Sequence, residues 1–205
     1  MTAPPKILLQ IAGASLHASP LKSSALILID HQMEYVTGAL PLAGIGAAIA
    51  EMGRLLATAR RHQVPVFHVV HHGRRGGPLF DPDGSQIAII PEVSPDPNEP
   101  VIVKSLPNAF AGTPLQEHVR DSGRTELIIA GFATHMCVSA TARAALDHGY
   151  RTTIVAAAVA TRDLPDPLGG GVIAADSLHR AALAALADRF AIIVADSTAL
   201  QASLC

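Results

Sequence analysis

Three side chains that could take part in nucleophilic catalysis each follow a short apolar run of the sequence. Asp30 follows Ala-Leu-Ile-Leu-Ile, Lys104 follows Val-Ile-Val, and Cys137 ends a seven-residue segment that begins at Gly131, after Leu-Ile-Ile-Ala. In a parallel sheet covered by helices, ligands bind beyond the carboxyl ends of the strands. A carboxylate, an ammonium and a thiol at that edge could together supply a general base and a nucleophile.

The strongest chemical argument concerns Cys137. The residues from Val138 to Leu146 have the composition of a helix and place the cysteine at its N-terminus. The helix dipole and free N–H groups favour a thiolate there, and a neighbouring Lys ammonium would lower the thiol pKa further. We therefore expect a reactive thiol with a depressed pKa. An inert buried cysteine is the alternative, because free cysteines are often core residues.

The elements that would position these residues follow the alternating pattern of βα units. Short runs rich in β-branched residues predict strands, and Ala- and Leu-rich segments of helical period predict helices between them. The predicted strands are 25–29, 64–70, 101–103, 126–130, 152–157 and 191–194, and the predicted helices are 45–62, 113–122, 137–148 and 174–188. This pattern predicts an α/β fold with a parallel six-stranded sheet in a three-layer α/β/α arrangement. The loop 71–100 has the length of a lid or binding loop.

The whole chain has the length and composition of one globular domain. With 205 residues, 49% of them hydrophobic, and no linker, we expect one domain at 25–205 after an N-terminal extension at 1–24. A formal net charge of -2 with scattered Lys and Arg argues against a nucleic-acid partner. No run reaches the length of a membrane span or a signal h-region, and Cys137 and Cys205 do not indicate a disulfide framework. We expect a cytoplasmic protein that acts on a small molecule.

Four segments of the chain resemble motifs of the isochorismatase-like cysteine hydrolase superfamily, which also contains nicotinamidases and related amidohydrolases. The segments are 28–32, 103–113, 131–141 and 160–163. Each is a modest signal by itself, but their combined order and separation are specific for the family. The resemblance extends from Ser24 to Ala195 and implies an isochorismatase-like fold. It also implies a catalytic triad of Asp30, Lys104 and Cys137. Together with the Ala-rich helices, it suggests a homo-oligomer, a dimer or a tetramer.

The chemistry that this resemblance implies is acyl transfer to water. Asp30 would take the thiol proton, Cys137 would attack a carbonyl carbon, and the backbone N–H groups of Thr134 and Cys137 would form the oxyanion hole. The family's cis peptide bond matches the bond between Ala133 and Thr134. The expected substrate is a small amide, lactam or ureido compound, and lactams of the streptothricin kind are substrates among relatives. Four side chains could line its pocket, although the two Phe residues could equally serve ordinary packing: His31, Tyr35, Phe110 and Phe132.

Departures from known family members leave alternatives open. True isochorismatases cleave a vinyl ether and carry a different residue at the cysteine position. Nicotinamidases bind a metal through an Asp-x-His pair and a further His, but no Asp-x-His precedes the loop here. His68, His71 and His72 suggest a metal site, yet adjacent His71 and His72 would point in opposite directions on a continued strand. We expect neither metal nor cofactor. A metal-dependent nicotinamidase-like amidase, an isochorismatase-type vinyl-ether hydrolase and an inactive binding protein of the same fold stay open.

Overall fold

All six predicted strands pair in one parallel sheet, which confirms the predicted fold class. The structure is a computed structural model that describes residues 4–201. The strand order is β3-β2-β1-β4-β5-β8, and each neighbouring pair is parallel. The strands are β1 Ser24–Ile29, β2 Val66–His71, β3 Val101–Lys104, β4 Glu126–Phe132, β5 Arg151–Ala160 and β8 Ile192–Val194. All six residues of β1 are buried, as expected for a central strand covered on both faces.

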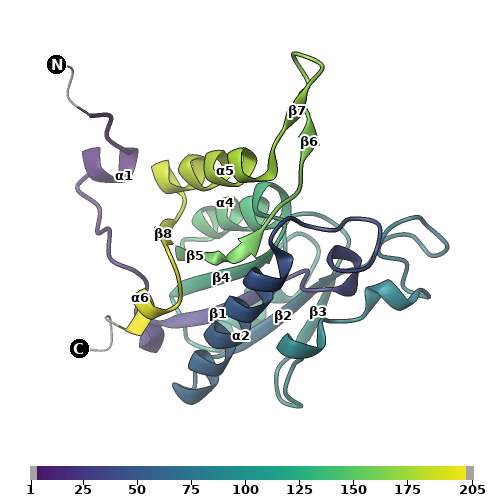
Figure 1. Cartoon of the computed structure of the whole chain (residues 1–205). Helices are drawn as coiled ribbons and strands as arrows, with labels where there is room; N and C mark the ends of the chain where they lie inside the picture. The colour runs from purple at the N-terminus through teal and green to yellow at the C-terminus, as the bar shows by residue number, and fades with distance from the viewer. Residues whose placement is uncertain (1–3, 202–205) are drawn as a thin grey trace.

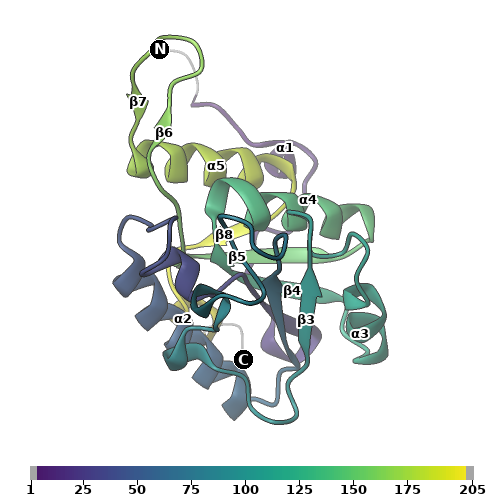
Figure 2. The ribbon, with the colours of Figure 1, turned by 90° about the vertical axis from the view of Figure 1, so that its right-hand side faces the viewer.

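Helices cover both faces of the sheet and complete the three layers (Figures 1 and 2). Leu26 and Leu28 of β1 pack in a cluster with the apolar face of α2, whereas Ile27 and Ile29 pack in a second cluster with α3, α4 and α5. This split follows from the alternation of side chains along a strand. The helices are α1 Leu8–Ile11, α2 Ile45–Arg61, α3 Leu115–Asp121, α4 Ser139–Asp147, α5 Ala175–Arg189 and α6 Thr198–Gln201.

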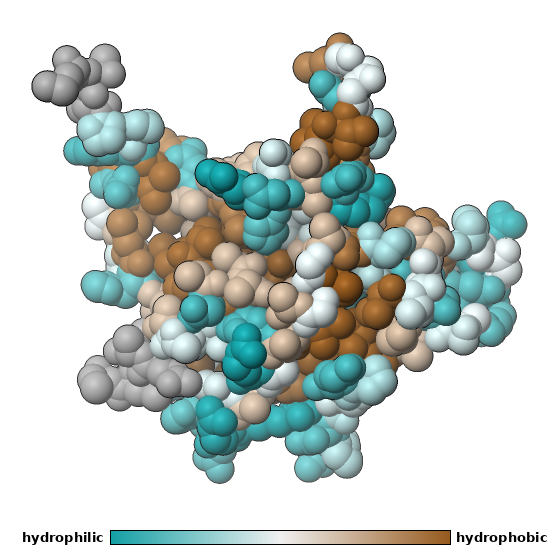
Figure 3. All heavy atoms as spheres, in the orientation of Figure 1, coloured by the Kyte–Doolittle hydropathy of each residue, from teal (hydrophilic) through white to brown (hydrophobic). Residues whose placement is uncertain are grey.

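The shorter elements show where the sequence pattern was incomplete. They are the 3-10 helices η1 Leu21–Ser23, η2 Met33–Tyr35, η3 Ser85–Ile87 and η4 Pro91–Val93, the π-helix η5 Thr134–Val138, and the strands β6 Leu164–Pro165 and β7 Val172–Ile173. The predicted helix 137–148 is therefore a π-helical segment that continues into α4. The β6–β7 hairpin was not predicted, because each strand has only two residues and too few to show a period. This hairpin projects from the body, with apolar side chains Leu168 and Val172 exposed by 96% and 71% (Figure 3).

The loop 71–100 lies against the body of the protein. Ile90 and Val93 are buried in the same apolar cluster as α2, and a β-bridge joins Gln32 to Ile89. The carboxylate of Glu34 accepts hydrogen bonds from the N–H groups of Phe80 and Ala39, at 3.0 and 2.7 Å. The loop is thus tied to the segment that follows β1.

The chain before β1 also contacts the body. The N–H group of Leu8 at the start of α1 donates to Asp188 of α5 at 2.7 Å, and that of Ser19 donates to Thr153 of β5 at 2.8 Å. Cys205 lies outside the described residues, so the structure does not test the expectation that Cys137 and Cys205 form no disulfide framework. Among the described helices, none is long and apolar enough to cross a membrane.

A close approach of β4 to β1 brings the segment before Cys137 next to Asp30. Gly131 of β4 has φ +119°, and a Cβ at this position would lie 2.6 Å from the Ile29 nitrogen and closer still to the Ile29 oxygen. No side chain fits between the two backbones at this point. The glycine is therefore required both by its φ angle and by the space available.

We predict that Gly131→Ala destabilises the protein by more than about 3 kcal/mol, because a strained φ angle and an overlap with rigid backbone add together. Gly149→Ala is the matched control. Gly149 also has a positive φ, +83°, but a Cβ there meets nothing within 4 Å. That variant should lose only about 1 kcal/mol. Urea unfolding of both variants measures the difference, and equal losses would contradict the close approach.

Candidate active site

The three residues predicted to form a triad converge in the structure. Lys104 Nζ donates to Asp30 Oδ2 at 2.8 Å and to Cys137 Sγ at 3.4 Å. Lys104 is 1% exposed, Asp30 0% and Cys137 3%. Asp30 follows β1, Lys104 ends β3, and Cys137 lies in η5 after β4, so the carboxyl ends of neighbouring strands bring them together. The long Lys side chain spans the end of the intervening strand β2.

A fourth side chain joins this group. His71 ends β2, between the strands that carry Asp30 and Lys104, and its Nδ1 lies 3.1 Å from Lys104 Nζ. Sequence reasoning considered His71 only as a possible metal ligand. The available signal was its position at the end of a strand, which is the same feature that identified Asp30 and Lys104.

The Asp30 carboxyl group has an unusual environment. Burial raises its pKa to about 6, although the charge of Lys104 and a hydrogen bond from it act in the opposite direction. Its second oxygen, Oδ1, is buried and has no hydrogen-bond partner within residues 4–201. The carboxyl group therefore ionises near neutral pH and keeps one oxygen free to accept a proton.

The expected depression of the Cys137 pKa is contradicted. Burial, and after it the negative charge of Asp30, raises the pKa of this thiol to about 12, although the charge of Lys104 acts in the opposite direction. Desolvation disfavours a thiolate more strongly than a helix N-terminus favours it. The thiol of Cys137 is thus neutral, and it would have to lose its proton to a base in order to act as a nucleophile.

The expected position of the cis peptide bond was wrong by one residue. The cis bond joins Phe132 to Ala133, whereas the resemblance placed it between Ala133 and Thr134. Neither bond precedes a proline, so the local sequence contains no signal that distinguishes them.

Two polar contacts anchor the segment that would supply the oxyanion hole. Thr134 Oγ1 lies 3.0 Å from Nδ1 of His179 in α5, and Nδ1 of His135 contacts the hydroxyl group of Thr161 after β5. Thr134 begins η5, and the first N–H groups of a helix have no partner within that helix. This backbone is therefore both held in place and suited to binding an anionic oxygen.

The four candidate pocket residues lie in different environments. Tyr35 packs edge-on against Phe132, with 5.7 Å between ring centroids, in the cluster on the α2 side. Burial, followed by the charges of Asp30 and Cys137, raises the pKa of the Tyr35 hydroxyl group. Phe110 belongs to the opposite cluster and stacks with Tyr150. Of these residues, Tyr35 is the one whose titration is influenced by the triad.

His31 forms part of a buried chain of polar side chains. Its Nε2 lies 2.9 Å from Nδ1 of His68, and His68 Nε2 lies 3.0 Å from a carboxylate oxygen of Glu99, which also pairs with Arg60. His68 and His71 therefore have separate partners. Across the described part of the chain, no group of three or more His, Cys, Asp and Glu residues is arranged to hold a metal ion.

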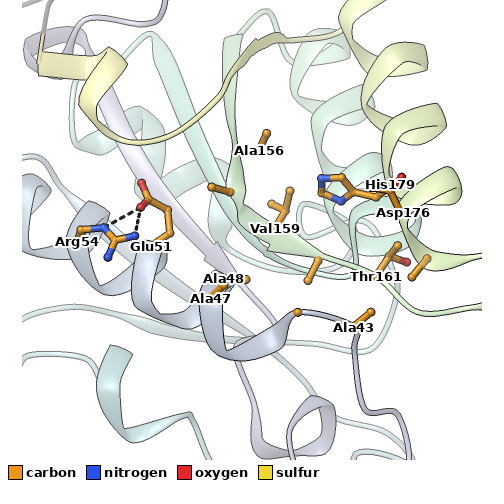
Figure 4. Close-up of a pocket in the computed structure, with 14 residues that line it drawn as sticks. Ala43, Ala47, Ala48, Glu51, Arg54, Ala156, Val159, Thr161, Asp176 and His179 are labelled. Carbon is orange, nitrogen blue, oxygen red and sulfur yellow. Dashed lines mark hydrogen bonds and ion pairs between the residues drawn. The ribbon is translucent and has the colours of Figure 1, made fainter.

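A cavity of about 470 Å³ lies beside the site, between α2, β5 and the start of α5 (Figure 4). Half of its lining residues are alanines, with Glu51 and Arg54 at one end and Thr161 and His179 at the other. Neither Cys137 nor the other triad residues line it. Thr161 and His179 hydrogen-bond to side chains of η5, so the cavity borders the segment that carries Cys137.

Comparisons with known proteins agree with this geometry. A family model described as an isochorismatase domain matches residues 24–197. The secreted isochorismatase effector Isc1 of Verticillium dahliae is 37% identical over 173 residues, which cover 84% of this chain and 88% of the relative. Streptothricin hydrolase of Streptomyces noursei is 34% identical over 82% of this chain and 67% of its own length. Maleamate amidohydrolase of Pseudomonas putida is 30% identical over 77% of this chain and 81% of its own length.

Solved structures show the same fold. An isochorismatase from Pseudomonas putida KT2440 superposes with a TM-score of 0.90 and is 41% identical. The match covers 96% of this chain and 100% of that structure. The similarity therefore includes the sheet and all the segments that carry Asp30, Lys104 and Cys137.

We predict that replacing the two charged neighbours changes the thiol pKa in opposite directions. Lys104→Ala should raise the pKa of Cys137 because it removes the positive charge, and Asp30→Asn should lower it because it removes the negative charge. The rate of iodoacetamide alkylation as a function of pH, measured on the Cys137 peptide by mass spectrometry, reports both shifts. Profiles that move in the same direction, or do not move, would contradict the contacts.

Proposed function

The chain belongs to the isochorismatase family of hydrolases, and on that premise we propose that it cleaves the C–N bond of a small amide, lactam or ureido compound through a thioester on Cys137. One observation carries the proposal. A single buried ammonium, Lys104 Nζ, hydrogen-bonds both the carboxylate of Asp30 and the sulfur of Cys137. When a base and a nucleophile contact the same cation, a proton can pass between them while the negative charge stays next to that cation.

The acylation half-reaction begins with proton transfer. Asp30 takes the thiol proton as the sulfur attacks the carbonyl carbon, and the carbonyl oxygen becomes an oxyanion bound by the N–H groups of Thr134 and Cys137. The oxyanion then collapses, the C–N bond breaks, and protonated Asp30 gives its proton to the leaving nitrogen. The product of this half-reaction is an amine and a thioester on Cys137.

Deacylation uses the same groups in reverse. Asp30 takes a proton from a water molecule, whose oxygen attacks the thioester carbon. The tetrahedral intermediate collapses, the C–S bond breaks, and protonated Asp30 gives its proton to the leaving sulfur. The carboxylic acid product leaves, and the site returns to a neutral thiol beside an ionised carboxyl group.

This chemistry suits an amide better than a vinyl ether. A sulfur nucleophile needs an electrophilic carbonyl carbon at the bond that breaks, and a poor amine leaving group needs a proton donor. Asp30, with its pKa raised to about 6, can serve as that donor once it has gained the thiol proton. Maleamate amidohydrolase, a relative whose name specifies an amide, supports the same substrate class.

We predict that Cys137→Ala abolishes turnover and leaves the fold intact. The loss of activity should be about a thousandfold or more, because no covalent intermediate can form, while stability should fall by less than about 2 kcal/mol. Wild-type and variant protein, treated with a chelator, would be incubated with amides, lactams, ureido acids and isochorismate. Mass spectrometry would detect the acyl-enzyme. Turnover of isochorismate alone, or activity that requires restored metal, would overturn the proposal.

We also predict an acid limb in the activity profile near pH 6. The base must be ionised to accept the thiol proton, and burial raises the pKa of Asp30 to about 6. Activity should therefore fall as the pH decreases through that value. The measurement is kcat/KM of any substrate found in the panel, between pH 4 and 9. A profile that stays flat down to pH 4 would exclude Asp30 as the base.

A further inference from the structure

We propose that His71 is a positioning residue that holds the Lys104 ammonium between Asp30 and Cys137 by serving as its third hydrogen-bond acceptor. This proposal rests on the proposed function, since it gives His71 a role in the same site. None of the sequence motifs assigned that role to this residue.

The argument begins with the number of hydrogen bonds that an ammonium can donate. A Lys side chain has three N–H donors and no acceptor. Lys104 Nζ has three neighbours within hydrogen-bond distance: Asp30 Oδ2 at 2.8 Å, His71 Nδ1 at 3.1 Å and Cys137 Sγ at 3.4 Å. Each donor thus has one acceptor. Without His71, one N–H of a buried cation would lack a partner, and Lys104 would have to rotate or lose its proton.

The same contact determines the tautomer of the imidazole ring. Nδ1 of His71 can accept from Lys104 only through its lone pair, so the ring proton must be on Nε2. Burial is the main reason that the pKa of His71 is lowered to about 4. The charges of Lys104 and His72 act in the same direction. The ring is therefore neutral at neutral pH and keeps the required lone pair.

Contacts other than the one with the Lys104 side chain also hold His71. The side-chain amide of Gln32 accepts from the His71 N–H at 2.8 Å and donates to the His71 carbonyl oxygen at 3.0 Å. Phe80 packs edge-on against the ring, with 4.9 Å between centroids. Gln32 thus holds the His71 backbone and Phe80 packs on its ring, so the position of His71 does not rest on the Lys104 side chain alone.

His71 is also the partner of Lys104 that reaches the surface. The three triad residues are buried, whereas His71 is half-buried. Replacement of the ring changes the hydrogen bonding of Lys104 without altering any of the reacting groups.

The test compares three variants of the full chain. His71→Leu removes the acceptor, His71→Asn keeps an acceptor oxygen close to the position of Nδ1, and His72→Leu is the matched control. His72 contacts Lys104 through its backbone N–H, which the substitution leaves in place. The readout is the pH profile of Cys137 alkylation by iodoacetamide, quantified on the isolated peptide.

At pH 8 we expect alkylation of His71→Leu to be about tenfold slower than that of the wild type, the equivalent of one hydrogen bond to a charged group. His71→Asn should stay within about twofold of the wild type, as should His72→Leu. An unchanged rate in His71→Leu would overturn the proposal. A rate in His71→Asn as low as in His71→Leu would also overturn it, because the acceptor would then be irrelevant.

A measurement on the wild type covers the case in which His71→Leu fails to fold. Ring ¹⁵N chemical shifts of His71 at pH 7 should show a proton on Nε2 and none on Nδ1. A protonated Nδ1 would overturn the proposal. Neither alkylation nor NMR needs a substrate, so a failed substrate panel would count against the proposed function and leave these two results unaffected.

Discussion

The burial of one ammonium group is the constraint on which the site depends. Taking a charge out of water costs several kcal/mol unless hydrogen bonds and an opposite charge replace the lost solvation. Lys104 is 1% exposed and obtains that replacement from a carboxylate, a thiol and an imidazole. These acceptors come from β1, β2 and the segment after β4, so the cation can be satisfied only when the whole carboxyl edge of the sheet is assembled.

Burial also determines the protonation states from which a reaction must start. The same desolvation raises the pKa of Asp30 to about 6 and that of Cys137 to about 12. The two values lie on either side of neutral pH, so a carboxylate faces a thiol. A permanently ionised sulfur would be exposed to oxidation and other side reactions, whereas a thiol beside a base becomes nucleophilic as its proton is removed.

Polar contacts between distant segments hold the groups around this cation. Gln32 clamps the backbone of His71, and Glu34 binds the N–H of Phe80, whose ring packs on His71. On the other side, His179 and Thr161 hold the segment that begins at Thr134. The site thus has rigid supports on both sides of Cys137, which is the arrangement that preorganised catalysis needs.

The sequence alone was sufficient for the fold class and for selecting three residues that the structure brings together. Apolar runs of strand length alternating with helical segments are a local property, and residues that end parallel strands must meet at one edge. Asp30, Lys104 and Cys137 can therefore be selected from the sequence. Three features depended on tertiary structure. The pKa of Cys137 depends on how deeply the thiol is buried, the cis bond lies at a position that no proline marks, and the contact of His71 with the Lys104 ammonium depends on where the His71 ring lies. These are properties of packing between segments distant in the chain, which local residue patterns do not encode.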